Sequence, residues 1–126
     1  MTAPCVTDFD DWLVATFART GAFTLLIVLV EIGAATVTPL SSSYLHVVGD
    51  ETRWPDMVAL LAGAGVAWEG AAFFQADRAG LVADGLAAQR LAALGRAIVR
   101  DRAILNDGDF FDRRGLRLKL EEIPAS

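Results

Sequence analysis

Residues 22–32 read AFTLLIVLVEI, and this stretch decides the fold. Only Glu31 interrupts its run of apolar side chains with a charge. The length of the run, its β-branched residues and its flanking glycines favour a strand that is buried on both faces. Alternation along a strand puts one set of side chains on the first face (Phe23, Leu25, Ile27, Leu29, Glu31) and the other set on the second (Thr24, Leu26, Val28, Val30, Ile32). Both faces are apolar, so other elements must cover both.

A membrane-spanning helix is the alternative for the same region, because residues 21–40 match the ~20 residues that a span requires. Glu31 argues against it, since a charge near the middle of a span costs roughly 2.5 to 3.5 kcal/mol on insertion scales. Pro39 and the threonines at 36 and 38 weaken the far end. The preceding residues are acidic and have a helical pattern, which argues against a signal peptide. We therefore expect no membrane partner.

Length and composition indicate one globular domain, residues 1–126, with its own core. The lone Cys5 cannot form an intramolecular disulfide, which favours a cytoplasmic protein. Residues 1–75 carry eight acids and two bases (−6), and residues 76–126 carry eight acids and nine bases (+1), which gives the net charge of −5. This charge argues against sequence-independent binding to nucleic acid, because such binding depends on neutralising phosphates.

Three helices are predicted from capping residues and apolar spacing. Thr7 and Asp10 resemble a capping box before a helix that ends at Gly21, with one apolar face formed by Phe9, Trp12, Leu13 and Phe17. A second helix begins near Pro55 and ends at Gly63. The longest helix spans residues 79–105 after Asp77. Its three glycines (Gly80, Gly85, Gly95) predict close packing on the sheet or a break near one end.

Further strands are predicted at residues 66–75 and 116–123, and Gly70 inside the former indicates a bulge or a close approach by another group. Residues 33–51 look irregular, with a short strand at 44–48 as the exception. Helices that join strands favour parallel pairs. We predict an α+β fold, with α/β as the alternative: a mixed sheet of three or four strands, layered by two or three helices.

Glu31 and Glu69 are candidate catalytic carboxylates, since burial in an apolar strand raises a carboxyl pKa toward the range of acid–base work. Parallel neighbouring strands would leave them about 16 Å apart at ~3.3 Å per residue, whereas an antiparallel pairing would bring them closer. The simpler interpretation is that Glu31 emerges at the strand end and Glu69 pairs with an arginine.

His46 is the only histidine and the third candidate. Ser41, Ser42, Ser43 and Asp50 lie near it in sequence, but no nucleophile elbow is present, and a plain loop histidine or one hydrogen-bonded in the fold is the better interpretation. No ligand spacing indicates a metal or a cofactor. Asp107, Asp109 and Asp112 do not match a calcium loop, and turn formation explains them.

Five residues are candidates for binding a ligand or partner: Tyr44, Trp54, Trp68, Arg96 and Arg100. Aromatic residues and arginine are enriched at interfaces, although aromatics are more often core material. Arg96 and Arg100 lie one helical turn apart and could bind an anion, or they could neutralise nearby acids.

Two functions remain open. The first is a small acidic cytoplasmic interaction module, of the antidote or regulatory-subunit type, that binds a basic protein. The second is an enzyme or ligand-binding domain with a pocket under residues 33–54, surrounded by Glu31, His46 and Glu69. The first strand, apolar on both faces, also predicts a homodimer.

Overall fold

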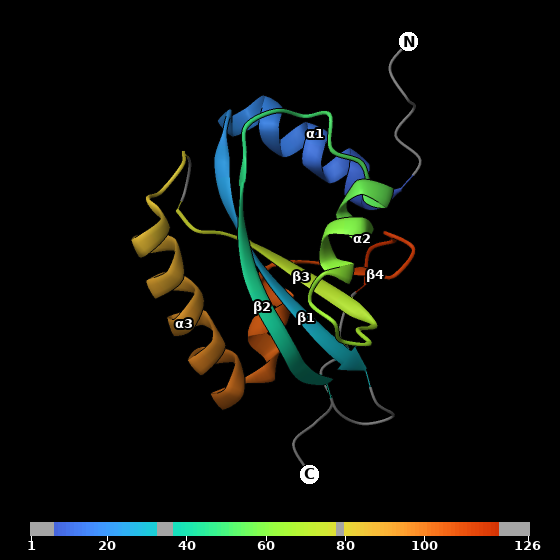
Figure 1. Ribbon diagram of the computed structural model, residues 1–126, viewed down its shortest axis with the longest axis vertical. Helices are drawn as coiled ribbons and strands as arrows, with labels where there is room; N and C mark the ends of the chain where they lie inside the picture. The colour runs from blue at the N-terminus through green and yellow to red at the C-terminus, as the bar shows by residue number, and fades with distance from the viewer. Residues whose placement is uncertain (1–6, 33–36, 78–79, 119–126) are drawn as a thin grey trace.

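The computed structural model describes residues 7–32, 37–77 and 80–118. Its elements in chain order are α1 (Asp8–Thr20), β1 (Phe23–Ile32), β2 (Val37–Val47), α2 (Trp54–Ala62), β3 (Gly70–Gln75), α3 (Asp84–Arg100), the short 3₁₀ helix η1 (Arg102–Asp107) and β4 (Asp109–Asp112). The strands form one sheet in the order β2-β1-β3-β4. Helices α1 and α2 lie on one side of this sheet and α3 on the other (Figure 1). The predicted α+β class is confirmed.

Strand β1 is the buried centre of the sheet, as the sequence predicts. All residues from Phe23 to Val30 are buried, whereas Glu31 is exposed. The two predicted faces are also confirmed, because they belong to two separate apolar clusters. The first cluster joins Phe23, Leu25, Ile27 and Leu29 to residues of α1 and α2. The second joins Val28 and Val30 to Ile98 of α3 and Leu105 of η1.

Helix α1 begins and ends where its capping residues predict. The Thr7 hydroxyl accepts a hydrogen bond from the Asp10 backbone N–H at 3.1 Å. At the other end Gly21 has a φ of 72° and donates its N–H to the Phe17 carbonyl. The Asp10 carboxylate is buried and accepts the Trp54 backbone N–H at 2.7 Å, which ties the start of α2 to α1.

The expectation of an irregular region at residues 33–51 is wrong for most of its length, because residues 37–47 form strand β2. Serine and threonine have little tendency to specify a strand alone, and the neighbouring strand β1 supplies the pairing. Pro39 is tolerated because the register shifts beside it, so that Leu40 has no partner on β1.

Parallel pairing is also corrected, since all three strand pairs are antiparallel rather than mixed. Strands β2 and β3 run in the same direction, as their helical connection predicts. Strand β1 lies between them and opposes both. Strands β2 and β3 are therefore parallel to each other but are not neighbours in the sheet. Within the described residues, one isolated parallel bridge joins Phe23 to Gly80.

Three element boundaries differ from the sequence prediction. Strand β3 contains only residues 70–75 of the predicted 66–75. The predicted helix 79–105 is instead α3, which Ala83 precedes as the N-cap, followed after Asp101 by η1. Gly80 lies outside the helix with a φ of 89°, so the predicted break falls near the N-terminal end. The last strand of the described residues is β4, and the described start of the predicted strand 116–123 pairs with it through an antiparallel bridge between Phe111 and Arg117. Residues 119–123 lie outside the described part.

Gly70 marks a close approach, as the sequence predicts for a glycine inside a strand. A Cβ atom at this position would overlap the Phe110 ring, which belongs to the neighbouring strand β4. Gly85 and Gly95 of α3 are different, because a Cβ at either position meets no atom within 4 Å. Close packing therefore does not explain these two glycines. No helix in the described ranges is long and apolar enough to cross a membrane.

Truncation of Leu29 tests the central position of β1. This side chain is 2% exposed, and Leu29→Ala should lower the free energy of unfolding by about 2 to 5 kcal/mol, because it leaves a cavity in the core. Leu60→Ala on α2 is the control, since Leu60 is 52% exposed and its loss should cost below about 1 kcal/mol. Equal losses for both variants in urea melts would contradict a buried β1.

Candidate functional site

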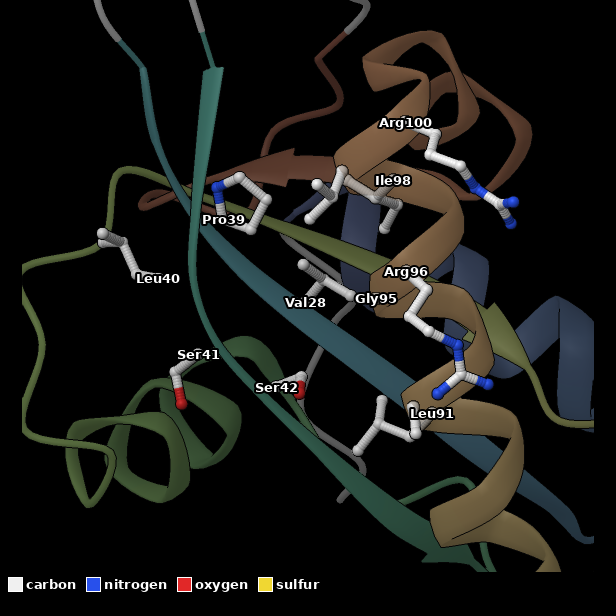
Figure 2. A pocket seen from close by; sticks show the side chains of 12 residues that line it. Val28, Pro39, Leu40, Ser41, Ser42, Leu91, Gly95, Arg96, Ile98 and Arg100 are labelled. Atoms are coloured by element: carbon white, nitrogen blue, oxygen red, sulfur yellow. The ribbon is translucent and has the colours of Figure 1, made fainter.

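An open groove of about 710 Å³ lies between β2 and α3. Figure 2 shows Val28 of β1 between the two elements. The β2 wall is formed by Pro39, Leu40, Ser41 and Ser42. The α3 wall is formed by Leu91, Ala92, Gly95, Arg96, Ile98, Val99 and Arg100. The groove is therefore largely apolar, with the Ser42 hydroxyl on the β2 wall, whereas Figure 2 shows the Ser41 side chain directed away from α3 and the Arg100 side chain directed away from β2.

The charged residues of the α3 wall are Arg96 and Arg100. Neither Arg96 nor Arg100 forms an ion pair or hydrogen bond with any residue of the described ranges. Helix α3 contains three arginines and only one acid, Asp84, whose carboxylate lies beside His46. On a chain with a net charge of −5, α3 is thus a local basic surface. The preferred sequence interpretation, in which these arginines neutralise nearby acids, finds no ion pair for either one within the described ranges, and anion binding stays a prediction.

Strand β2 is an edge strand, and its backbone shows which groups face outward. Thr24 and Val30 of β1 direct their carbonyls to Ala76 and Glu69 on the β3 side. Backbone groups alternate along a strand, so Leu25, Ile27 and Leu29 face β2, where their partners are Leu45, Ser43 and Ser41. The N–H and C=O groups of Ser42, Tyr44 and His46 therefore point away from the sheet, and their side chains lie on the α3 face.

His46 joins β2 to the start of α3 through both ring nitrogens. Its Nδ1 lies 2.9 Å from the Thr24 hydroxyl, and its Nε2 lies 2.6 Å from the Asp84 carboxylate. The same hydroxyl accepts the Val82 backbone N–H at 2.9 Å. The Thr24 hydroxyl and the Asp84 carboxylate therefore engage both ring nitrogens.

Thr24, His46 and Asp84 follow one another in the order of a nucleophile, a base and an acid, but their hydrogen bonds serve to hold the fold together. Thr24 is 0% exposed, so a substrate cannot reach its hydroxyl. The serine triad considered from the sequence is not assembled, because the carboxylate beside His46 belongs to Asp84 and not to Asp50. The interactions hold the segment before α3, and α3 itself, against the sheet. These interactions lie at one end of the space between β2 and α3 that contains the groove.

The other catalytic candidates lie at the opposite end of the sheet. Glu69 accepts the Ile32 backbone N–H at 3.1 Å, so its partner is the backbone of β1 and not an arginine. The antiparallel register places Glu31 across from Glu69, just beyond the last strand pair. Both residues are exposed, whereas the catalytic hypothesis required buried carboxylates.

The three candidates therefore do not surround a common pocket. His46 pairs with Thr24, seven residues before Glu31 on β1, so about 23 Å separate these ends at ~3.3 Å per residue. The region that was expected to close the pocket is instead largely strand β2.

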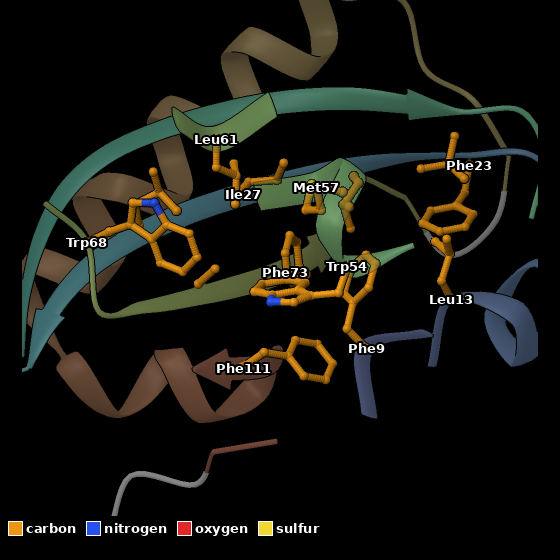
Figure 3. Packing of buried hydrophobic residues seen from close by; sticks show 14 residues of the cluster. Phe9, Leu13, Phe23, Ile27, Trp54, Met57, Leu61, Trp68, Phe73 and Phe111 are labelled. Atoms are coloured by element: carbon orange, nitrogen blue, oxygen red, sulfur yellow. The ribbon is translucent and has the colours of Figure 1, made fainter. Parts of the chain in front are cut away.

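Two of the aromatic candidates belong to the core on the opposite face of the sheet. Trp54 and Trp68 are each 4% exposed, and Figure 3 shows them among Phe9, Phe73 and Phe111. The Trp54 indole donates to the Arg113 carbonyl at 2.8 Å. Such buried rings offer no surface to a partner. Tyr44 differs, because it is half-buried on the α3 face of β2 with its ring 5.7 Å from His46.

The turn aspartates serve the turns themselves. Asp112 accepts the backbone N–H groups of Arg114 and Leu116, and Asp109 pairs with Arg117 at 2.8 Å. Among the described residues, no three histidine, cysteine, aspartate or glutamate side chains gather to hold a metal ion.

Sequence reasoning missed Thr24 and Asp84 as the partners of His46. A signal for Thr24 was present, because it is the one hydroxyl inside the apolar run and a buried hydroxyl requires a hydrogen-bond partner. Asp84 lay inside the overlong predicted helix. The groove could not be found while β2 was expected to be mostly irregular.

No protein-family model, curated protein sequence or solved structure matches the chain. Functional inference for this protein therefore depends on its geometry.

The buried hydroxyl of Thr24 is open to a direct test. Thr24→Val keeps the side-chain shape but leaves the Val82 N–H and His46 Nδ1 without their partner. We expect a loss of about 1 to 3 kcal/mol in the free energy of unfolding, measured in urea. Thr24→Ser keeps the hydroxyl and is the control for a change at this position. A Thr24→Val protein as stable as the wild type would show that these hydrogen bonds are not needed.

Proposed function

We propose that this protein is a small interaction module that binds an extended segment of a partner protein along the free edge of β2. The observation that carries the proposal is the combination of outward backbone groups on this edge with the groove beside it. Added strands gain affinity from main-chain hydrogen bonds, and pockets beside the edge select alternate side chains. In Figure 1, β2 lies in front of β1, with α3 to one side and α2 to the other.

The usable part of the edge is its C-terminal half. Pro39 has no N–H to offer, and the irregularity at Leu40 interrupts the strand. Ser42, Tyr44 and His46 follow without interruption and direct their backbone groups outward. A bound segment would therefore pair with residues 42–46. Its side chains on the α3 face would enter the groove between Ser42 and Gly95.

Binding is a better-supported function than catalysis at this site. Both ring nitrogens of His46 are engaged by Thr24 and Asp84, so the ring is not free to act as a general base. Serine and arginine are the only polar residue types in the groove lining, given by Ser41, Ser42, Arg96 and Arg100. These groups suit recognition of an anion or of a polar backbone. The lone cysteine supports a cytoplasmic location for such a module.

The expected basic partner has weaker support than the sequence suggested. Eight acidic side chains accept hydrogen bonds within the chain itself: Asp8, Asp10, Asp56, Glu69, Asp84, Asp101, Asp109 and Asp112. Much of the negative charge therefore has a structural role. A basic partner stays a prediction that rests on net charge alone.

Proline at an outward position of β2 tests strand addition. Ser42→Pro removes one outward N–H without breaking a hydrogen bond to β1, so the thermal midpoint should change little. The proteins that the wild type retains from its native lysate should be lost. Ser42→Ala, which keeps the N–H, is the matched control and should retain them. Retention by a folded Ser42→Pro protein would overturn binding at this edge.

A further inference from the structure

We infer, on the premise of the proposed strand addition, that the segment bound along β2 carries a lysine or arginine on its α3-facing side, where it meets Asp84. The part of the edge that can pair, residues 42–46, ends at His46, and the Asp84 carboxylate lies 2.6 Å from the Nε2 atom of this histidine. A cation at that position gains a charge-assisted hydrogen bond. One basic side chain is sufficient, whatever the net charge of the partner.

The Asp84 carboxylate is available to such a cation. Its side chain is 74% exposed, and within the described ranges His46 is its one side-chain partner, through the Oδ1 atom alone. A carboxylate offers about four acceptor positions on its two oxygens. Most of these positions therefore face solvent, where a side chain of the bound segment can replace water.

The charge of α3 changes sign along its length. Asp84 is the first residue of the helix and stands beside the part of β2 that can pair. Arg96 and Arg100 lie in the C-terminal half of the helix, beside Pro39, which has no N–H to offer an added strand. Figure 2 shows the Arg100 side chain directed away from β2. A strand bound to residues 42–46 therefore meets a negative charge on this face.

Tyr44 offers a second contact to the same cation. Its side chain is half-buried on the α3 face of β2, and its ring lies 5.7 Å from the His46 ring. Basic side chains bury their aliphatic stems along apolar surface and interact favourably with aromatic rings. A lysine or arginine beside Tyr44 can therefore lay its stem on the ring and direct its charge toward Asp84. Arg90, the first base of α3, lies about 120° around the helix axis from Asp84 at ~100° per residue and does not line the groove.

The pairing geometry limits where the basic residue stands. Residues directly opposite each other on paired strands have their Cβ atoms about 4.5 to 5.5 Å apart and their side chains on the same face. The residue opposite Tyr44 or His46 therefore projects over the α3 face, whereas its two sequence neighbours project over the other face of the sheet. The groove beside Ser42 is largely apolar. The pattern that fits is an extended segment with one basic residue among alternate, otherwise apolar positions.

A second copy of this chain is a poorer occupant of the same edge. Residues 37–47 contain no lysine or arginine, so the β2 strand of another copy would bring neither of these cations to Asp84. Each copy also has a net charge of −5, and this repulsion opposes pairing. We therefore expect the unliganded protein to sediment as a monomer.

Peptide binding tests the basic position. The probe is the fluorescein-labelled peptide VTVTRTVT, and its affinity for the full chain is measured by fluorescence anisotropy. The peptide VTVTQTVT is uncharged at the same position and is the reference. We expect the arginine peptide to bind about threefold to fivefold more tightly, which is the gain from an ion pair that stays partly exposed. The difference should shrink at about 1 M salt, because salt screens exposed charges.

Asp84→Asn assigns the preference to one carboxylate. The asparagine side chain keeps the shape and can still engage His46, but the negative charge is gone, so the two peptides should bind equally. Glu31→Gln is the matched control, since it removes one exposed negative charge at the opposite end of β1 and should leave the preference unchanged. The readout is the ratio of two affinities on the same protein, so a change in the folded fraction does not alter it.

The outcomes separate the basic position from strand addition itself. Equal affinity of the wild type for the two peptides, both lost in Ser42→Pro, would overturn the basic position and leave strand addition standing. A preference that Asp84→Asn retains, or that Glu31→Gln removes equally, would contradict recognition by Asp84. Binding that a folded Ser42→Pro protein retains, or failure of both peptides to bind, would overturn strand addition. A stable dimer that binds neither peptide would assign the edge to a second copy.

Discussion

The structure depends on covering a single strand on both faces. Strand β1 is apolar from Phe23 to Val30 except for Thr24, and all of these residues are buried. One layer of helices could bury only half of them, so α1 and α2 cover one face, and α3 with η1 covers the other. The hydrophobic effect makes this requirement strong, since each fully buried large aliphatic side chain contributes about 1.5 to 3 kcal/mol. The order of the sheet follows, with β1 paired on both edges.

The same requirement creates the candidate site. Because β1 occupies the centre, β2 becomes an edge strand, and α3 lies across the face that β1 and β2 share (Figure 1). Thr24, the one hydroxyl in the buried stretch, hydrogen-bonds His46 and the segment before α3. It therefore fixes the N-terminal end of α3 relative to β2. Farther along, small side chains on both elements leave the groove, and Arg96 and Arg100 of its lining have no ion-pair partner among the described residues.

Local signals in the sequence predicted the elements that local physics specifies. Thr7, Asp10 and Gly21 marked the ends of α1, and the apolar run marked β1, because caps and buried strands depend on nearby residues. Strand β2 could not be predicted from its serines, because its pairing with β1 supplies what its own residues lack. The sequence named Arg96, Arg100 and Tyr44 only as candidates for binding a ligand or partner, together with two tryptophans that belong to the core. The placement of Tyr44 and the two arginines on two neighbouring elements, β2 and α3, depends on the tertiary packing of the helix against the sheet.

Amide hydrogen exchange along β2 tests the central claim most directly, because it reads the alternation of inward and outward groups residue by residue. In the free protein, the amides of Ser43 and Leu45 should be protected by β1, and those of Ser42 and Tyr44 should exchange rapidly. The amides of Phe23 to Val30 should be the slowest in the chain. A bound extended segment of a partner should slow Ser42 and Tyr44 selectively. Equal protection of Ser42 and Ser43 in the free monomer would contradict a free β2 edge, and with it the account of the site.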